Sequence, residues 1–256
     1  MKLALSSNFA LNLLMVASLS QMWSVVNALQ VMTYQPLFFV KFPANATSFN
    51  QKLIAIAQFQ FLPAELLNEM FFFFPEVEPF NVNFQQMGYD TIFLVPNLGS
   101  LFYVLIIYLA VIILSVLLAI PFHFCQVLRK MIHKVHEKLF WSGILRFGME
   151  IFMELSLSTI LHLYTSPDPE GFPSIQFSNI LAHIFGALII ALPLWTILFY
   201  LRNKSLWIDE EFEQRYGTPL DGIKVDRKDH TWIPVILPTV FMMRRLFFCL
   251  TVVLSP

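Results

Sequence analysis

Three ionisable side chains recur at four-residue intervals inside an apolar stretch: Arg146, Glu150 and Glu154. Because a helix turns by about 100° per residue, this spacing places them within an arc of about 80° on one face. Each would cost about 2.5 to 3.5 kcal/mol facing lipid at mid-helix, so the stripe should face protein and be paired. Three interpretations stay open: a salt bridge from Arg146 to Glu150 that locks helix packing, an ion or proton path along the two glutamates, and a shifted span in which Arg146 reaches the inner membrane surface.

Two adjacent arginines, Arg244 and Arg245, lie in the last apolar stretch. If a helix begins near Trp232, they lie about 17 to 18 Å along it, where they could complement the carboxylates of the stripe. Adjacent helical residues point about 100° apart, so the two arginines cannot reach the same carboxylate. Alternatively, the pair marks the cytoplasmic start of a helix that this chain truncates, which Pro234 and Pro238 upstream favour.

The remaining residues of chemical interest indicate packing. His162 and His183 fall inside apolar runs, where a lone histidine is either a hydrogen-bonded packing residue or a proton relay. Cys125 and Cys249 lack CxxC or Cys/His spacing, so we expect inert apolar thiols. The sequence contains no GxSxG, HExxH, Walker or GxGxxG pattern. We therefore expect no enzymatic activity, no metal and no cofactor.

The composition indicates more apolar surface than the core of one soluble domain needs. The chain is 57% hydrophobic and 13% charged and contains 28 phenylalanines, whereas soluble domains are about 25% charged. The surplus of apolar surface predicts the lipid bilayer as a partner. A net charge of -1 offers no basic excess for a phosphate-binding face, so nucleic acid is not expected as a partner.

The apolar runs predict an all-α, polytopic bundle of four or five transmembrane helices. The clearest run, residues 101–120, is long enough at about 1.5 Å per residue to cross a hydrocarbon core of about 30 Å. The last run is shorter and interrupted. Residues 1–32 form either a further span or a signal peptide. The helix bundle is expected over residues 100–256, with spans at about 100–121, 139–164, 177–201 and 232–254.

The distribution of Lys and Arg predicts the orientation. Basic residues gather in residues 123–138 and 202–231, whereas residues 33–99 contain two and residues 165–176 contain none. Because basic loops are retained on the cytoplasmic side, residues 33–99 should be extracytoplasmic. The N-terminus is then cytoplasmic unless a signal peptide is cleaved. We expect a plasma membrane or another membrane of the secretory pathway.

The segment over residues 33–99 is itself apolar. Its prolines divide it into pieces too short to span, which favours interfacial or re-entrant helices. The sequon Asn45-Ala46-Thr47 lies in this segment, so Asn45 is a possible glycosylation site.

Several blocks of the sequence together carry a resemblance to a known family. They are SQMWSVVNALQVMTYQPLFFVKFPANATSFNQKLIAIAQFQFLPAE, FNVNFQQMGYDTIFLVPNLGSLF, KLFWSGILRFGMEIFMELSLSTIL, EFEQRYGTPLDGIK and MMRRLFFCLTVVL. From about residue 18 to its end, the chain resembles the multi-span C-terminal region of large Cys-rich ciliate cell-surface proteins, and loosely the membrane domain of the TRP-like family. The resemblance implies a membrane location. Together with the predicted spans, it favours a non-enzymatic membrane-anchoring or channel-like region.

Two departures from the family limit what the resemblance implies. The chain has no Cys-rich part, so a recognition role of such repeats is not expected. It also stops at Pro256, where the relatives continue into further helices, so we expect a truncated chain whose partners are further membrane subunits or the remainder of a larger chain. The alternative function is an ion channel or transporter subunit that uses Glu150 and Glu154 inside the membrane.

Overall fold

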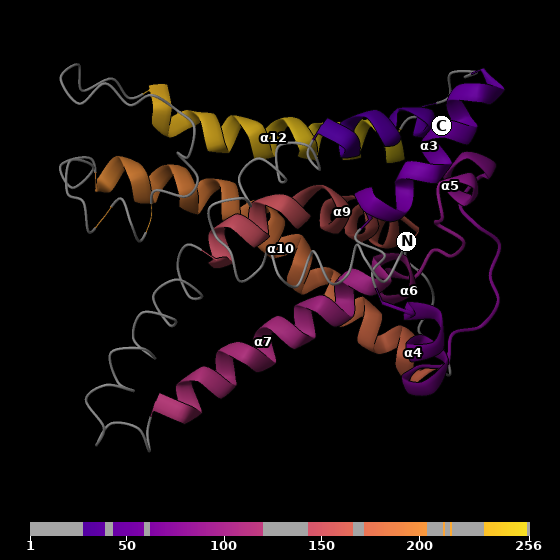
Figure 1. Cartoon of the computed structure of the whole chain (residues 1–256), viewed down its shortest axis with the longest axis horizontal. Coiled ribbons are helices and arrows are strands. Elements are labelled where there is room, and N and C mark those ends of the chain that lie inside the picture. The colour runs from indigo at the N-terminus through magenta and orange to yellow at the C-terminus, as the bar shows by residue number, and fades with distance from the viewer. Residues whose placement is uncertain are drawn as a thin grey trace. The chain divides into compact units, whose positions relative to one another are not determined.

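The protein is described by a computed structural model in which the regular elements are helices (Figure 1). The described residues are 28–38, 43–58, 62–119, 143–165, 172–203, 212, 216 and 233–254. No strand occurs among them, which confirms the all-α prediction. Most of the predicted first span and most of the two basic loops lie outside the described residues.

Four long helices occupy the regions in which spans were predicted. They are α7 (Ser100–Ala119), α9 (Ile144–Thr165), α10 (Pro173–Arg202) and α12 (Ile233–Leu254). Three of them, α7, α10 and α12, are long and apolar enough to cross a membrane. The helix α9 falls outside this group among the described residues; it is less apolar and carries Arg146, Glu150 and Glu154. The count of four or five spans therefore stays a prediction.

The segment before α7 folds into short helices, as its prolines predict. These are η1 (Gln35–Leu37), α3 (Ala44–Ala57), α4 (Ala64–Phe71), α5 (Val82–Gln86) and α6 (Leu94–Leu98). Even α3, with 14 residues, is only about 21 Å long at 1.5 Å per residue, too short for a hydrocarbon core of about 30 Å. We call the described residues from 28 to 98 the docked segment.

Individual residues set the limits of these short helices. Pro36 lies in the first turn of η1 and Pro63 precedes α4. Asn81 caps α5, because its Oδ1 accepts the Phe84 backbone N–H at 2.9 Å. Gly99 separates α6 from α7. Its φ of +51° is a backbone conformation that residues other than glycine rarely adopt.

The chain divides into two compact units, and the long helices each contribute one end to the first. This first unit comprises residues 1–103, 153–189 and 246–256, and the second comprises residues 104–152 and 190–245. The first unit thus holds the beginnings of α7 and α10 and the ends of α9 and α12. Within this unit, the beginnings of α7 and α10 therefore occur together with the ends of α9 and α12.

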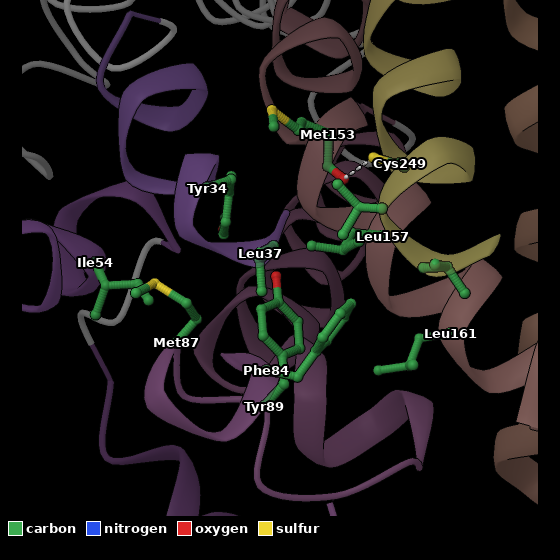
Figure 2. Close-up of a cluster of buried hydrophobic side chains, with 12 residues drawn as sticks. Tyr34, Leu37, Ile54, Phe84, Met87, Tyr89, Met153, Leu157, Leu161 and Cys249 are labelled. Atoms are coloured by element: carbon green, nitrogen blue, oxygen red, sulfur yellow. Dashed lines mark hydrogen bonds between the residues drawn. The ribbon is translucent and has the colours of Figure 1, made fainter. Parts of the chain in front are cut away.

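The core of the first unit joins the docked segment to α9 and α12 (Figure 2). From α9 it takes Met153, Leu157 and Leu161, which share one face because they are spaced by four residues. Its other members are Tyr34, Leu37, Ile54, Phe84, Met87, Tyr89, Cys249, Val252 and Val253. Residues 150–159 of α9 are buried without interruption, so protein surrounds this part of the helix on every side.

Candidate functional site

A buried carboxylate in α9, that of Glu154, is the most distinctive polar group of the first unit. Glu154 is fully buried, and each of its oxygens accepts a hydrogen bond from a tyrosine. The Tyr34 hydroxyl donates to Oε2, and the Tyr89 hydroxyl donates to Oε1 at 2.9 Å. We call these three residues the Glu154 clamp. Both donors belong to the docked segment, so the clamp connects that segment to α9.

The fold brings the two tyrosines to Glu154 from separate places. Tyr34 lies directly before η1, and Tyr89 follows α5. Their rings lie 6.4 Å apart, and Tyr89 also packs edge-on against Phe84. Burial, followed by the nearby Glu154 carboxylate, raises the pKa of both hydroxyls well above the usual value of 10.0. Both tyrosines therefore keep the protons that they donate to the carboxylate.

The other members of the predicted stripe differ in burial. Glu150 is buried one turn before Glu154 on α9, whereas Arg146 is half-buried another turn earlier. The boundary between the two compact units falls between Phe152 and Met153, so only Glu154 belongs to the unit that contains the docked segment. The three charges thus occupy different environments, although one helix carries them.

The arginine pair lies in the middle of α12 rather than at its start. Arg245 is buried, donates from Nη1 to the Met149 carbonyl oxygen at 3.1 Å and lies over the Phe241 ring at 4.2 Å. The neighbouring Arg244 is exposed. The two side chains therefore meet different surroundings, as the 100° between adjacent helical residues predicts.

His162 forms a second polar cluster in the first unit, near the end of α9. Its Nδ1 accepts the Leu94 backbone N–H at 3.2 Å, and its Nε2 lies 2.6 Å from Asn179 Oδ1. Ser178 Oγ accepts the same Leu94 N–H at 3.1 Å. These bonds fix the start of α6 against α9 and α10, which favours the packing role over a proton relay for His162. His183, by contrast, is exposed, and its Nδ1 lies 2.8 Å from the Asn179 carbonyl oxygen.

The remaining candidate residues are the two cysteines and the asparagine of the sequon. Cys249 is buried, and its thiol donates to the Met153 carbonyl oxygen at 3.6 Å (Figure 2). Asn45 is exposed in the first turn of α3. Among the described residues, no group of three His, Cys, Asp or Glu could hold a metal ion. Cys125 lies outside the described residues.

The sequence pointed to Glu154 but not to its partners. Tyr34 lies 120 residues before Glu154 in the chain and Tyr89 lies 65 residues before it. No local periodicity relates positions so far apart. The available signal was the presence of single tyrosines in a segment otherwise rich in phenylalanine, since a buried tyrosine needs a partner for its hydroxyl.

Comparison with known proteins adds no relative to this description. No protein-family model, no curated protein and no solved structure matches the chain. The resemblance to ciliate surface proteins therefore stays a prediction.

Proposed function

We propose that this chain is a non-enzymatic, polytopic membrane anchor that holds the docked segment against one membrane surface. The helices α7, α10 and α12 would provide the spans, in keeping with their length and apolar composition. The resemblance to the membrane region of ciliate surface proteins supports the same role. In this proposal the membrane is the plasma membrane or another secretory-pathway membrane, and further membrane subunits complete the assembly.

The Glu154 clamp is the observation that carries the proposal. A buried carboxylate is costly unless its oxygens accept hydrogen bonds, and here both acceptors are used by tyrosines of the docked segment. A carboxylate used in this way fixes one part of the chain to another. It would be poorly placed to exchange protons or bind a substrate while the clamp is closed.

Membrane fractionation combined with proteolysis tests the proposal. The full-length protein should stay in membranes washed with alkaline carbonate, and protease added to intact membranes or unsealed vesicles should spare the docked segment. The Glu154→Leu variant should also stay in the membranes but lose this protection. Recovery of the wild-type chain in the soluble fraction would refute the membrane anchor, and equal protection in both proteins would refute the role of the clamp.

A second candidate function is an ion channel or transporter subunit. Three buried hydroxyls of α9, those of Ser156, Ser158 and Thr159, have no hydrogen-bond partner within the part of the chain that the structure describes. With Glu154 they would offer polar groups to an ion or to water in the interior. Recordings from reconstituted protein decide this alternative: flux should appear and should change in the Glu150→Gln, Glu154→Gln double variant. An absence of flux, or flux that the double variant leaves unchanged, counts against it.

A further inference from the structure

An exposed apolar surface lies on α4 and the residues that follow it. Four large side chains point outward, with exposed fractions of 61% for Leu66, 75% for Met70, 66% for Phe71 and 69% for Phe73. Leu66 and Met70 share one face of α4, because they are four residues apart. We call these four residues the α4 patch. A contiguous patch of this kind on a protein usually marks a binding surface or a membrane contact.

The phenylalanine run after Met70 alternates between the two sides of the chain. The backbone is extended at Phe72, so successive side chains point in opposite directions. Phe72 stacks on Phe177 of α10 at 5.5 Å, and Phe74 packs against Phe93 at 5.2 Å. The alternation leaves Phe71 and Phe73 exposed, although one face of the Phe73 ring stacks on Phe172 at 5.7 Å. Packing of the inward rings holds the run in place.

Hydrogen bonds fix the α4 patch at the beginnings of two candidate membrane spans. The Tyr103 hydroxyl, in the first turn of α7, donates to Asn68 Oδ1 of α4 at 2.7 Å. The Phe73 backbone N–H donates to Ser174 Oγ, in the first turn of α10, at 3.1 Å. Since α7 and α10 both begin at this level, the patch lies where these helices would enter the bilayer.

The patch also continues into the outward face of α10. Phe177, which stacks on Phe72, is itself exposed, and Ile180 follows on α10 with its side chain exposed. If α10 crosses a membrane, these side chains contact lipid just below the α4 patch. Lipid is then the apolar medium that lies nearest to the patch.

The charges beside the patch indicate how it would meet a membrane. Glu65 and Glu69 are exposed on α4 next to Leu66 and Met70, and residues 53–98 contain no Lys or Arg. Attraction to anionic lipid headgroups therefore cannot drive insertion. Burial of apolar side chains would have to drive it, with the two carboxylates turned toward the headgroups and water.

We propose that the α4 patch inserts into the bilayer leaflet that α7 and α10 enter. The docked segment would then contact the membrane through a shallow apolar insertion. The proposal rests on the membrane location proposed above and adds the surface that the docked segment uses. An amphipathic helix in this position lies along the membrane plane, with its apolar face about 5 to 10 Å below the headgroup boundary.

Site-directed spin labelling of the full chain in phosphatidylcholine vesicles tests this insertion. Nitroxides are placed at Met70→Cys, Phe73→Cys and Glu69→Cys, in a background with Cys125→Ala and Cys249→Ala, and collision rates with oxygen and with a water-soluble nickel chelate are measured. The labels at 70 and 73 should favour oxygen, at a depth of about 5 to 10 Å, whereas the label at 69 should favour the chelate. Anionic phosphatidylglycerol in the vesicles should leave the depth unchanged or make it shallower.

A label at Ile113→Cys, on the exposed face of α7, separates the two proposals. If this label is deep in lipid while the labels at 70 and 73 favour the chelate, the shallow insertion is wrong and the membrane anchor stands. If the labels at 70 and 73 are shielded from both reagents, a protein surface covers the patch and the insertion is wrong. Insertion that occurs only with anionic lipid also overturns the proposal. A label at 113 that favours the chelate would overturn the membrane anchor itself.

Discussion

The helices α7 and α9 have similar lengths and opposite surroundings. In α7, large apolar side chains are exposed along most of its length, whereas residues 150–159 of α9 are all buried. The polar groups are distributed in the reverse sense, since α9 carries Glu150, Glu154 and several hydroxyls while α7 is almost wholly apolar. In a bilayer the most apolar helix can be the outermost one, and a helix with charges must be enclosed by protein.

Replacing a polar side chain by leucine should give the largest difference in stability loss between α9 and α7. In α9, Glu154→Leu removes the acceptor of two buried hydroxyls, which costs about 1 to 3 kcal/mol for each hydroxyl left unsatisfied. In α7, Ser115→Leu removes only a bond from Oγ to the Ile112 carbonyl oxygen and should leave stability nearly unchanged. Unfolding of the reconstituted variants measures both. Equal losses would show that the two helices have similar surroundings.

Removing apolar volume should give the next largest difference. Leu157 is fully buried in the core of the first unit, so Leu157→Ala should lower the free energy of unfolding by about 2 to 5 kcal/mol. Leu114 on α7 is 54% exposed, and Leu114→Ala should change the free energy of unfolding by about 0.5 kcal/mol or less. The same unfolding measurement applies, and a costly Leu114→Ala would place α7 against protein instead of lipid.

Single Tyr→Phe substitutions test whether the tyrosines of the Glu154 clamp act through the carboxylate. Tyr34→Phe and Tyr89→Phe each remove one donor and leave Glu154 with the other, so each should cost about 1 to 3 kcal/mol. A double-mutant cycle with Glu154→Gln should show coupling, because the residues contact one another. Additive effects across the cycle would argue that the tyrosines act through packing and not through the carboxylate.

The arginine pair of α12 offers a smaller version of the same comparison. Arg245→Met removes the bond to the Met149 carbonyl oxygen and the contact with Phe241, so a loss of about 1 to 2 kcal/mol is expected. Arg244→Met alters an exposed side chain and should change stability by about 0.5 kcal/mol or less. Thermal unfolding in detergent compares the two. A larger loss for Arg244→Met would indicate a partner that covers this face of α12.

Much of the helical architecture could be predicted from local patterns. The apolar runs located α7, α9, α10 and α12 to within about five residues, and the prolines predicted that the docked segment would break into short helices. Hydropathy works here because helices must satisfy their own backbone within a bilayer. It did not separate α9 from the candidate spans, since a polar stripe is compatible with a span only when other protein encloses it.

The site was predictable only on the α9 side. The spacing of Glu150 and Glu154 predicted that both would need protein partners, and both are buried. The partners of Glu154 depend on how η1 and α5 fold back onto α9, which involves contacts between residues 65 and 120 positions apart. Such contacts follow from tertiary packing, and a local pattern in one sequence does not contain them.

Amide hydrogen exchange in lipid vesicles tests most directly whether Glu154 fixes the docked segment. Amides around Tyr34 and over residues 84–89 should be protected in the wild-type protein and exchange much faster in the Glu154→Leu variant, while those of α7 stay protected in both. Unchanged exchange around the tyrosines, or an equal loss of protection throughout α7, would contradict this role of Glu154.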